Sequence, residues 1–117
     1  MKQKGGWFKV KQIYFANAFS LQMLDISKEN MISIVPLTKG ETKELLKEGF
    51  ISAIGHPDTA QVLTSELGFE IELNRISLSL GKEDVLLVAQ LTGGRLPEGS
   101  TTLPDGFAFK YLKVELL

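Results

Sequence analysis

The sequence of 117 residues contains no cysteine, only one histidine and no long hydrophobic run. Without cysteine the chain has no disulfide and no thiolate ligand, and a zinc site would have to be built mostly from carboxylates. No apolar stretch approaches the roughly 18 to 20 residues that span a bilayer, and the N-terminus lacks the apolar core of a signal peptide. We therefore expect a cytoplasmic protein with no metal, no cofactor and no membrane partner.

The chain also lacks an excess of charge of either sign. It has 13 basic and 14 acidic residues, which give a formal net charge of −1. Binding to duplex nucleic acid through bulk counterion release needs a basic surface, so we expect no duplex partner. The sequence contains no G-x-S-x-G elbow, and this absence argues against a serine hydrolase.

The length and the hydrophobic pattern predict a single α/β domain. The fold class that we expect is a mixed central sheet of about five strands flanked by helices. The expected strands are residues 12–15, 31–37, 51–54, 85–89 and 107–114, with Pro36 ending the second of them. The expected helices are residues 20–24 with Ser20 as the cap, 39–48 and 57–67. Thr38 and Glu41 match a capping box at the start of the second helix, and Gly68 is a suitable stop for the third. The continuous apolar run at residues 85–89 predicts a central strand covered on both faces.

The segment from Phe69 to Leu80 changes its hydrophobic phase in the middle. Apolar residues alternate up to Leu73, and the alternation resumes at Ile76 in the opposite phase. Because strand side chains have a period of two, the slip predicts a strand with a bend or bulge at Asn74 and Arg75, or a plain junction between two strands.

The only histidine, His56, lies where a short apolar run gives way to a helix. Gly55 permits a sharp turn, and Pro57 is a favoured first helical residue because its missing N–H would have no partner there. The first turn of a helix attracts anions through its unpaired N–H groups, so a phosphate could bind beside the imidazole. The alternative interpretation is a capping or solvated loop histidine.

A second candidate region is the glycine-rich loop at residues 92–106. Loops of this length in a small domain are often lids or binding loops. Its candidate charged residues are Arg95 and Glu98, which follow Gly93 and Gly94. They form either a surface pair or an anion clamp, in which Glu98 orients the Arg95 guanidinium toward phosphate oxygens.

Three stretches in this order and spacing resemble the viral type III anti-CRISPR ring nuclease family, and Asn74-Arg75 lies between the second and the third. The resemblance covers residues 12–116, and it implies one ring-nuclease-like domain at residues 12–117, preceded by an N-terminal extension, residues 1–11, that has no counterpart. The stretches are Asn17-Ala18-Phe19-Ser20-Leu21, Ile51-Ser52-Ala53-Ile54-Gly55-His56 and Gly93-Gly94-Arg95-Leu96-Pro97-Glu98-Gly99.

The resemblance implies a two-fold homodimer that binds cyclic tetra-adenylate and cuts it, without a metal, into linear di-adenylate with a 2′,3′-cyclic phosphate. This reaction would antagonise type III CRISPR signalling. By the same resemblance His56 is the catalytic histidine, with Arg95 and Glu98 beside it in the active site. The substrate-binding residues that we expect are Asn17, Ser20, Arg75, Gly93 and Gly94. The sequence departs from the family pattern at Gln22, where an asparagine is expected.

Two other classes of function stay open on the sequence alone. The first is a non-catalytic protein that binds a nucleotide or DNA. The second is a protein-interaction module of a virus or mobile element, in which His56 is a loop residue and the glycine-rich segment binds a partner.

Overall fold

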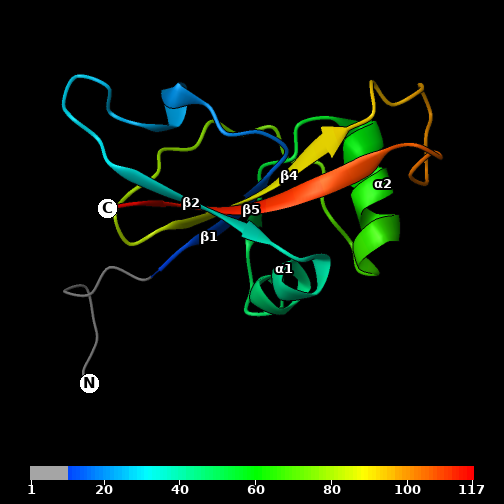
Figure 1. Ribbon diagram of the computed structural model, residues 1–117, viewed down its shortest axis with the longest axis horizontal. Coiled ribbons are helices and arrows are strands. Elements are labelled where there is room, and N and C mark those ends of the chain that lie inside the picture. Colours follow the sequence, from blue (N-terminus) through cyan, green and yellow to red (C-terminus); the bar gives the residue numbers. More distant parts are fainter. Residues whose placement is uncertain (1–10) are drawn as a thin grey trace.

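A five-stranded mixed sheet with both α-helices on one face forms the framework of the protein (Figure 1). The structure is a computed structural model that describes residues 11–117, so the predicted extension lies almost wholly outside the described residues. The predicted α/β class and the sheet of about five strands are confirmed. The strands are β1 (Ile13–Ala16), β2 (Ile32–Leu37), β3 (Ile51–Ser52), β4 (Val85–Thr92) and β5 (Ala108–Leu116).

The strands lie in the order β2-β5-β4-β1-β3, and this order and the strand directions determine where a site can form. Strand β1 is parallel to both of its neighbours, β3 and β4, whereas β5 is antiparallel to β4 and β2. The carboxyl ends of β1, β3 and β4 therefore meet at one edge of the sheet. Ligands of α/β sheets commonly bind outside this edge.

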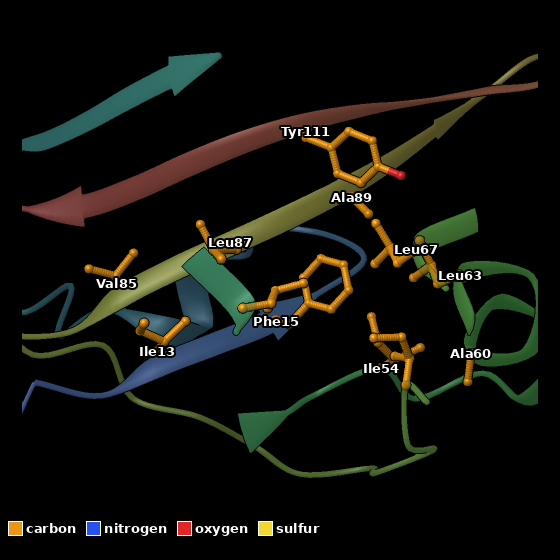
Figure 2. Close-up of a cluster of buried hydrophobic side chains, with 12 residues drawn as sticks. Ile13, Phe15, Ile54, Ala60, Leu63, Leu67, Val85, Leu87, Ala89 and Tyr111 are labelled. Carbon is orange, nitrogen blue, oxygen red and sulfur yellow. The ribbon is translucent and has the colours of Figure 1, made fainter. Parts of the chain in front are cut away.

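Strand β4 is the centre of the core, as its continuous apolar run predicts. Each residue from Val85 to Ala89 is buried. Because side chains alternate along a strand, Leu87 and Ala89 pack with Phe15 of β1 on the helix face, where Leu63 and Leu67 of α2 also lie (Figure 2). A second cluster of buried residues lies on the opposite face of the sheet, which is covered by irregular chain and not by an α-helix. Its members are Ala16, Leu78, Leu80, Leu86, Val88 and Val114.

Helix α1 (Lys39–Leu46) begins with the predicted capping box. The Thr38 Oγ1 accepts a bond from the Glu41 backbone N at 3.1 Å, and the Glu41 carboxylate accepts one from the Thr38 N at 2.8 Å. The helix ends before the predicted Glu48 because the following amides bond three residues back and tighten the last turn. Among residues 11–117 no helix has the length and apolarity to cross a membrane.

Helix α2 (Pro57–Leu67) agrees with its prediction at both ends. Pro57 is its first residue, and Gly68 stops it in the left-handed conformation with φ of 82°. Its Leu63 and Leu67 side chains are buried against the sheet. A short 3-10 helix, η1 (Leu21–Met23), follows β1 with Ser20 as its cap, close to the helix predicted there.

The prediction of strands between Phe69 and Leu80 is wrong. This segment forms only one isolated bridge, between Ile54 and Leu73. Its backbone amides find other partners: Ile71 N donates to Thr64 Oγ1 at 2.9 Å, and Leu80 N donates to Met23 O at 2.8 Å. Ile71 is buried in the same cluster as residues of α2, and Leu78 and Leu80 are buried in the cluster against which Met23 of η1 packs. Leu73 and Ile76 are 47% and 41% exposed, so the alternation does not mark a paired strand.

Pro36 does not end β2, contrary to the prediction, but lies inside it. Strand β2 is at the edge of the sheet and pairs only with β5, with Pro36 opposite Leu112. Proline is tolerated on an edge strand because the missing N–H can face the unpaired side.

Tyr111 on β5 carries a polar atom in the core. The side chain is 6% exposed, and its hydroxyl has no hydrogen-bond partner among the described residues. Burial, helped by the negative charge of Glu66, raises the pKa of Tyr111 to about 12 from its usual 10.0. The neutral phenol is therefore the form that the folded protein favours.

We predict that Tyr111→Phe leaves the free energy of unfolding at pH 7 unchanged or raises it by up to about 1 kcal/mol. The substitution removes a buried hydroxyl that makes no hydrogen bond within residues 11–117, so no bond is broken. Urea denaturation of both proteins measures the difference. A loss above about 1 kcal/mol would show that the hydroxyl is bonded.

The same pair of proteins should diverge at high pH. The unfolded tyrosine ionises near 10.0 and the folded one near 12, so the unfolded state binds fewer protons in this window. The stability of the wild type should consequently fall more steeply than that of Tyr111→Phe between these two pH values.

Candidate active site

His56 lies between β3 and α2, at the cap position of the helix. Its backbone is extended, with φ of −124°, and its side chain makes no capping bond to the first turn of α2, which is fully described. The capping role considered for this histidine is therefore wrong. The imidazole is exposed at the positive end of the helix, where an anionic ligand can meet it.

The structure brings His56 together with the two charged residues of the β4–β5 loop, residues 93–107. A surface pocket of about 450 Å³ is lined by His56, Pro57, Asp58, Arg95, Leu96 and Glu98. The first three come from the start of α2 and the others from the loop. Arg95 and Glu98 do not form an ion pair with each other among the described residues, so the guanidinium remains available to a ligand.

The β4–β5 loop is attached to α2 at two points. Gly99 N donates to Asp58 Oδ2 at 3.2 Å, and the Ser65 hydroxyl donates to Thr101 O at 2.6 Å. Gly99 belongs to a turn at residues 97–100, in which Ser100 N donates to Pro97 O at 3.1 Å. These contacts explain how residues about 40 positions apart in the sequence line one pocket.

Arg75 lies beside Gly55, on the irregular segment that follows α2. Asn74 anchors this segment, because its side-chain amide donates to Ser52 O at 2.7 Å. Arg75 Nε then donates to Gly55 O at 2.8 Å, one residue before His56. Arg75 does not line the pocket itself, but this bond uses only one donor of the guanidinium and leaves its terminal nitrogens for other partners.

Asn17 and Ser20 follow β1 at the same edge of the sheet, outside the pocket lining. Asn17 is exposed directly after the strand. The Ser20 side chain accepts a bond from the Gln22 N at 3.2 Å, so it has the capping role that its position predicts. The pocket and these two residues share an edge, and only the pocket residues are brought into one cavity.

Gly93 and Gly94 have a packing role that their motif does not reveal. Both have positive φ, 107° and 134°. A Cβ atom on Gly93 would lie 2.6 Å from the Gly106 carbonyl oxygen and 2.8 Å from the Cα of Phe107. The two ends of the loop therefore approach so closely that only glycine fits at position 93, and neither glycine lines the pocket.

The sequence analysis missed Asp58 and Leu96 as members of the pocket. Asp58 reads in sequence as an ordinary acidic residue in the first turn of a helix, and its contact with Gly99 spans 41 positions. No local pattern signals such a contact.

The fold and the pocket define a small α/β protein with a polar site at the carboxyl ends of parallel strands. The chain belongs to the STIV B116-like family, whose model matches residues 13–107. It is 44% identical over 88 residues to "Uncharacterized protein 26" of Sulfolobus islandicus filamentous virus (isolate Iceland/Hveragerdi), covering 74% of this chain and 73% of the relative. The structure resembles B116 of Sulfolobus turreted icosahedral virus with a TM-score of 0.72 and 26% identity, over 89% of this chain and 98% of B116. The family is thus one of archaeal virus proteins.

We predict that Gly93→Ala lowers the free energy of unfolding by about 1 to 3 kcal/mol, because the new methyl group meets backbone atoms at a strained φ. Thermal denaturation measures the loss. Gly99→Ala is the matched control: its φ is also positive, at 81°, but no atom lies within 4 Å of the new Cβ. Equal losses in both variants would contradict a packing role for Gly93.

Proposed function

We propose that the protein is a metal-independent ring nuclease that cleaves cyclic tetra-adenylate into linear di-adenylate with a 2′,3′-cyclic phosphate and so antagonises type III CRISPR signalling. The observation that carries this proposal is the convergence of His56, Arg95 and Glu98 on one pocket from two separate segments. The pocket is open to solvent, which suits a ligand as large as a cyclic tetranucleotide.

In this reaction the protein has to position the substrate, stabilise the charge on the phosphate and supply one proton. The ribose 2′-OH loses its proton to solvent as its oxygen attacks the adjacent phosphorus, the bond from phosphorus to the 5′-oxygen breaks, and the leaving 5′-oxygen takes a proton. His56 is the general acid that supplies this proton. Its place at the start of α2 puts it beside unpaired backbone N–H groups, which suit a phosphate.

Arg95 stabilises the charge that grows on the phosphate oxygens in the transition state. Its planar fork of donors matches two such oxygens, and Glu98 lines the same pocket. Arg75 adds a second guanidinium, held by Gly55 O close to His56. Asn17 and Ser20 extend the binding surface along the sheet edge toward a neighbouring nucleotide.

We propose further that the protein acts as a homodimer. A two-fold dimer can place one His56 from each subunit at opposite phosphates of the ring, so that two cuts give equal halves. The edge strand β2 supplies apolar groups for this contact. Ile34 and Pro36 are exposed on the face where their β5 partners, Val114 and Leu112, are buried and half-buried. Ile34 in this set is 52% exposed.

We predict that the purified protein converts cyclic tetra-adenylate to linear di-adenylate with cyclic phosphate in excess EDTA. His56→Ala should lower the single-turnover rate by about 10² or more, because the leaving oxygen loses its acid. Chromatography with mass detection of the products measures both rates.

The control for this assay is Asp105→Asn, an exposed carboxylate of the same loop outside the pocket lining. It should cleave at the wild-type rate. An inactive wild type under saturating ligand would reject the nuclease. Binding measured on the same sample would then separate a nucleotide-binding protein from a protein-interaction module.

The dimer surface generates a prediction of its own. Ile34→Glu should convert the dimer to a monomer at micromolar concentration, because the new carboxylate would have to be buried without a partner. Val35→Glu is the matched control, since Val35 is 39% exposed on the same edge strand but points to the opposite face. Sedimentation equilibrium gives the mass of each variant, and a dimer that survives Ile34→Glu rules out this face.

A further inference from the structure

We propose that Asp58 is a positioning residue that latches the β4–β5 loop to α2 and thereby holds Arg95 and Glu98 beside His56. The inference rests on the proposed function for the chemistry that the latch serves. The latch itself rests on contacts between described residues.

The primary contact is the bond from Gly99 N to the Asp58 carboxylate at 3.2 Å. Asp58 is the second residue of α2, and Gly99 directly follows Glu98 in the loop. Gly99 has φ of 81°, a conformation that glycine adopts without strain and that turns its N–H toward the helix. The anchor is thus one residue from Glu98 and four from Arg95.

A second tether fixes the direction of the loop. The Ser65 hydroxyl donates to Thr101 O at 2.6 Å, seven residues along α2 from Asp58. Seven residues correspond to roughly 10 Å along a helix axis. A single contact would let the loop pivot, whereas two contacts on one helix fix both the place and the orientation of the segment between Gly99 and Thr101.

The latch also explains why a carboxylate lies in a pocket suited to phosphate. An unengaged Asp58 would repel an anionic ligand at short range. The first turn of α2 stabilises its negative charge, and Gly99 N occupies one of its oxygens. One carboxylate oxygen of Asp58 therefore serves to hold the loop, and the binding of phosphate is left to His56 and the arginines.

The decisive variants are Asp58→Ala, which removes the acceptor, and Asp58→Asn, which keeps an acceptor oxygen. Asp105→Ala is the control for removal of a loop carboxylate. Hydrogen exchange followed by NMR should show the Gly99 amide exchanging about ten-fold faster in Asp58→Ala. Asp58→Asn should retain most of the protection, and Asp105→Ala should match the wild type. Unchanged exchange in Asp58→Ala would overturn the latch.

The kinetic arm tests what the latch does for the reaction. Cleavage of cyclic tetra-adenylate by Asp58→Ala should show a kcat lower by about ten-fold with KM changed less than about two-fold, and Asp58→Asn should recover most of kcat. Faster Gly99 exchange together with an unchanged kcat would overturn the positioning role.

The two proposals can fail separately. A wild type that does not cut the ring rejects the nuclease and not the latch. The positioning role is then decided by the Arg95 Nε–H resonance, which must shift in Asp58→Ala and stay in place in Asp58→Asn; an unshifted resonance in both overturns it.

Discussion

The backbone pairing of β1 with β3 on one side and β4 on the other is the constraint on which the rest of the structure depends. It aligns three strands in one direction, with Phe15 opposite Ser52 and opposite Leu87. Three chain segments that are far apart in sequence consequently leave the sheet at the same edge. The start of α2 and the β4–β5 loop leave β3 and β4 at this edge, so the sheet brings the segments that line the pocket close to one another, and the two bonds between the loop and α2 complete the contact.

Features that depend on local chemistry could be predicted from the sequence. The capping box at Thr38, the proline start and the glycine stop of α2, and the buried run of β4 each involve residues within one or two turns or one strand of each other. The residues that interact in these features are close to one another in the sequence. The alternation after Phe69 was misleading because it includes the exposed Leu73 and Ile76. Its buried members lie in clusters with α2, η1 and the faces of the sheet and have no paired strand beside them in the part of the chain that the structure describes.

The site follows the same division. His56 could be found because a lone histidine before a proline-initiated helix has a local signature, and Arg95 and Glu98 because they lie in a glycine-rich loop. Their meeting in one pocket, and the part played by Asp58, depend on a contact across 41 positions that no spacing rule contains. The glycine-rich sequence did not reveal why glycine is needed. Position 93 requires glycine because the backbone of Gly106 lies too close for a side chain, and Gly93 does not line the pocket.

The narrow neck of the β4–β5 loop has a consequence for how the family can diversify. Thr92 pairs with Ala108, and the Thr92 hydroxyl donates to Ala108 O at 3.0 Å, so the sheet is complete where the loop departs. Closing a longer loop on such a neck costs only about 0.6 kcal/mol for each doubling of its length. Insertions and deletions at the tip can thus accumulate without disturbing the core. The neck therefore separates the length and sequence of this wall of the pocket from the integrity of the sheet.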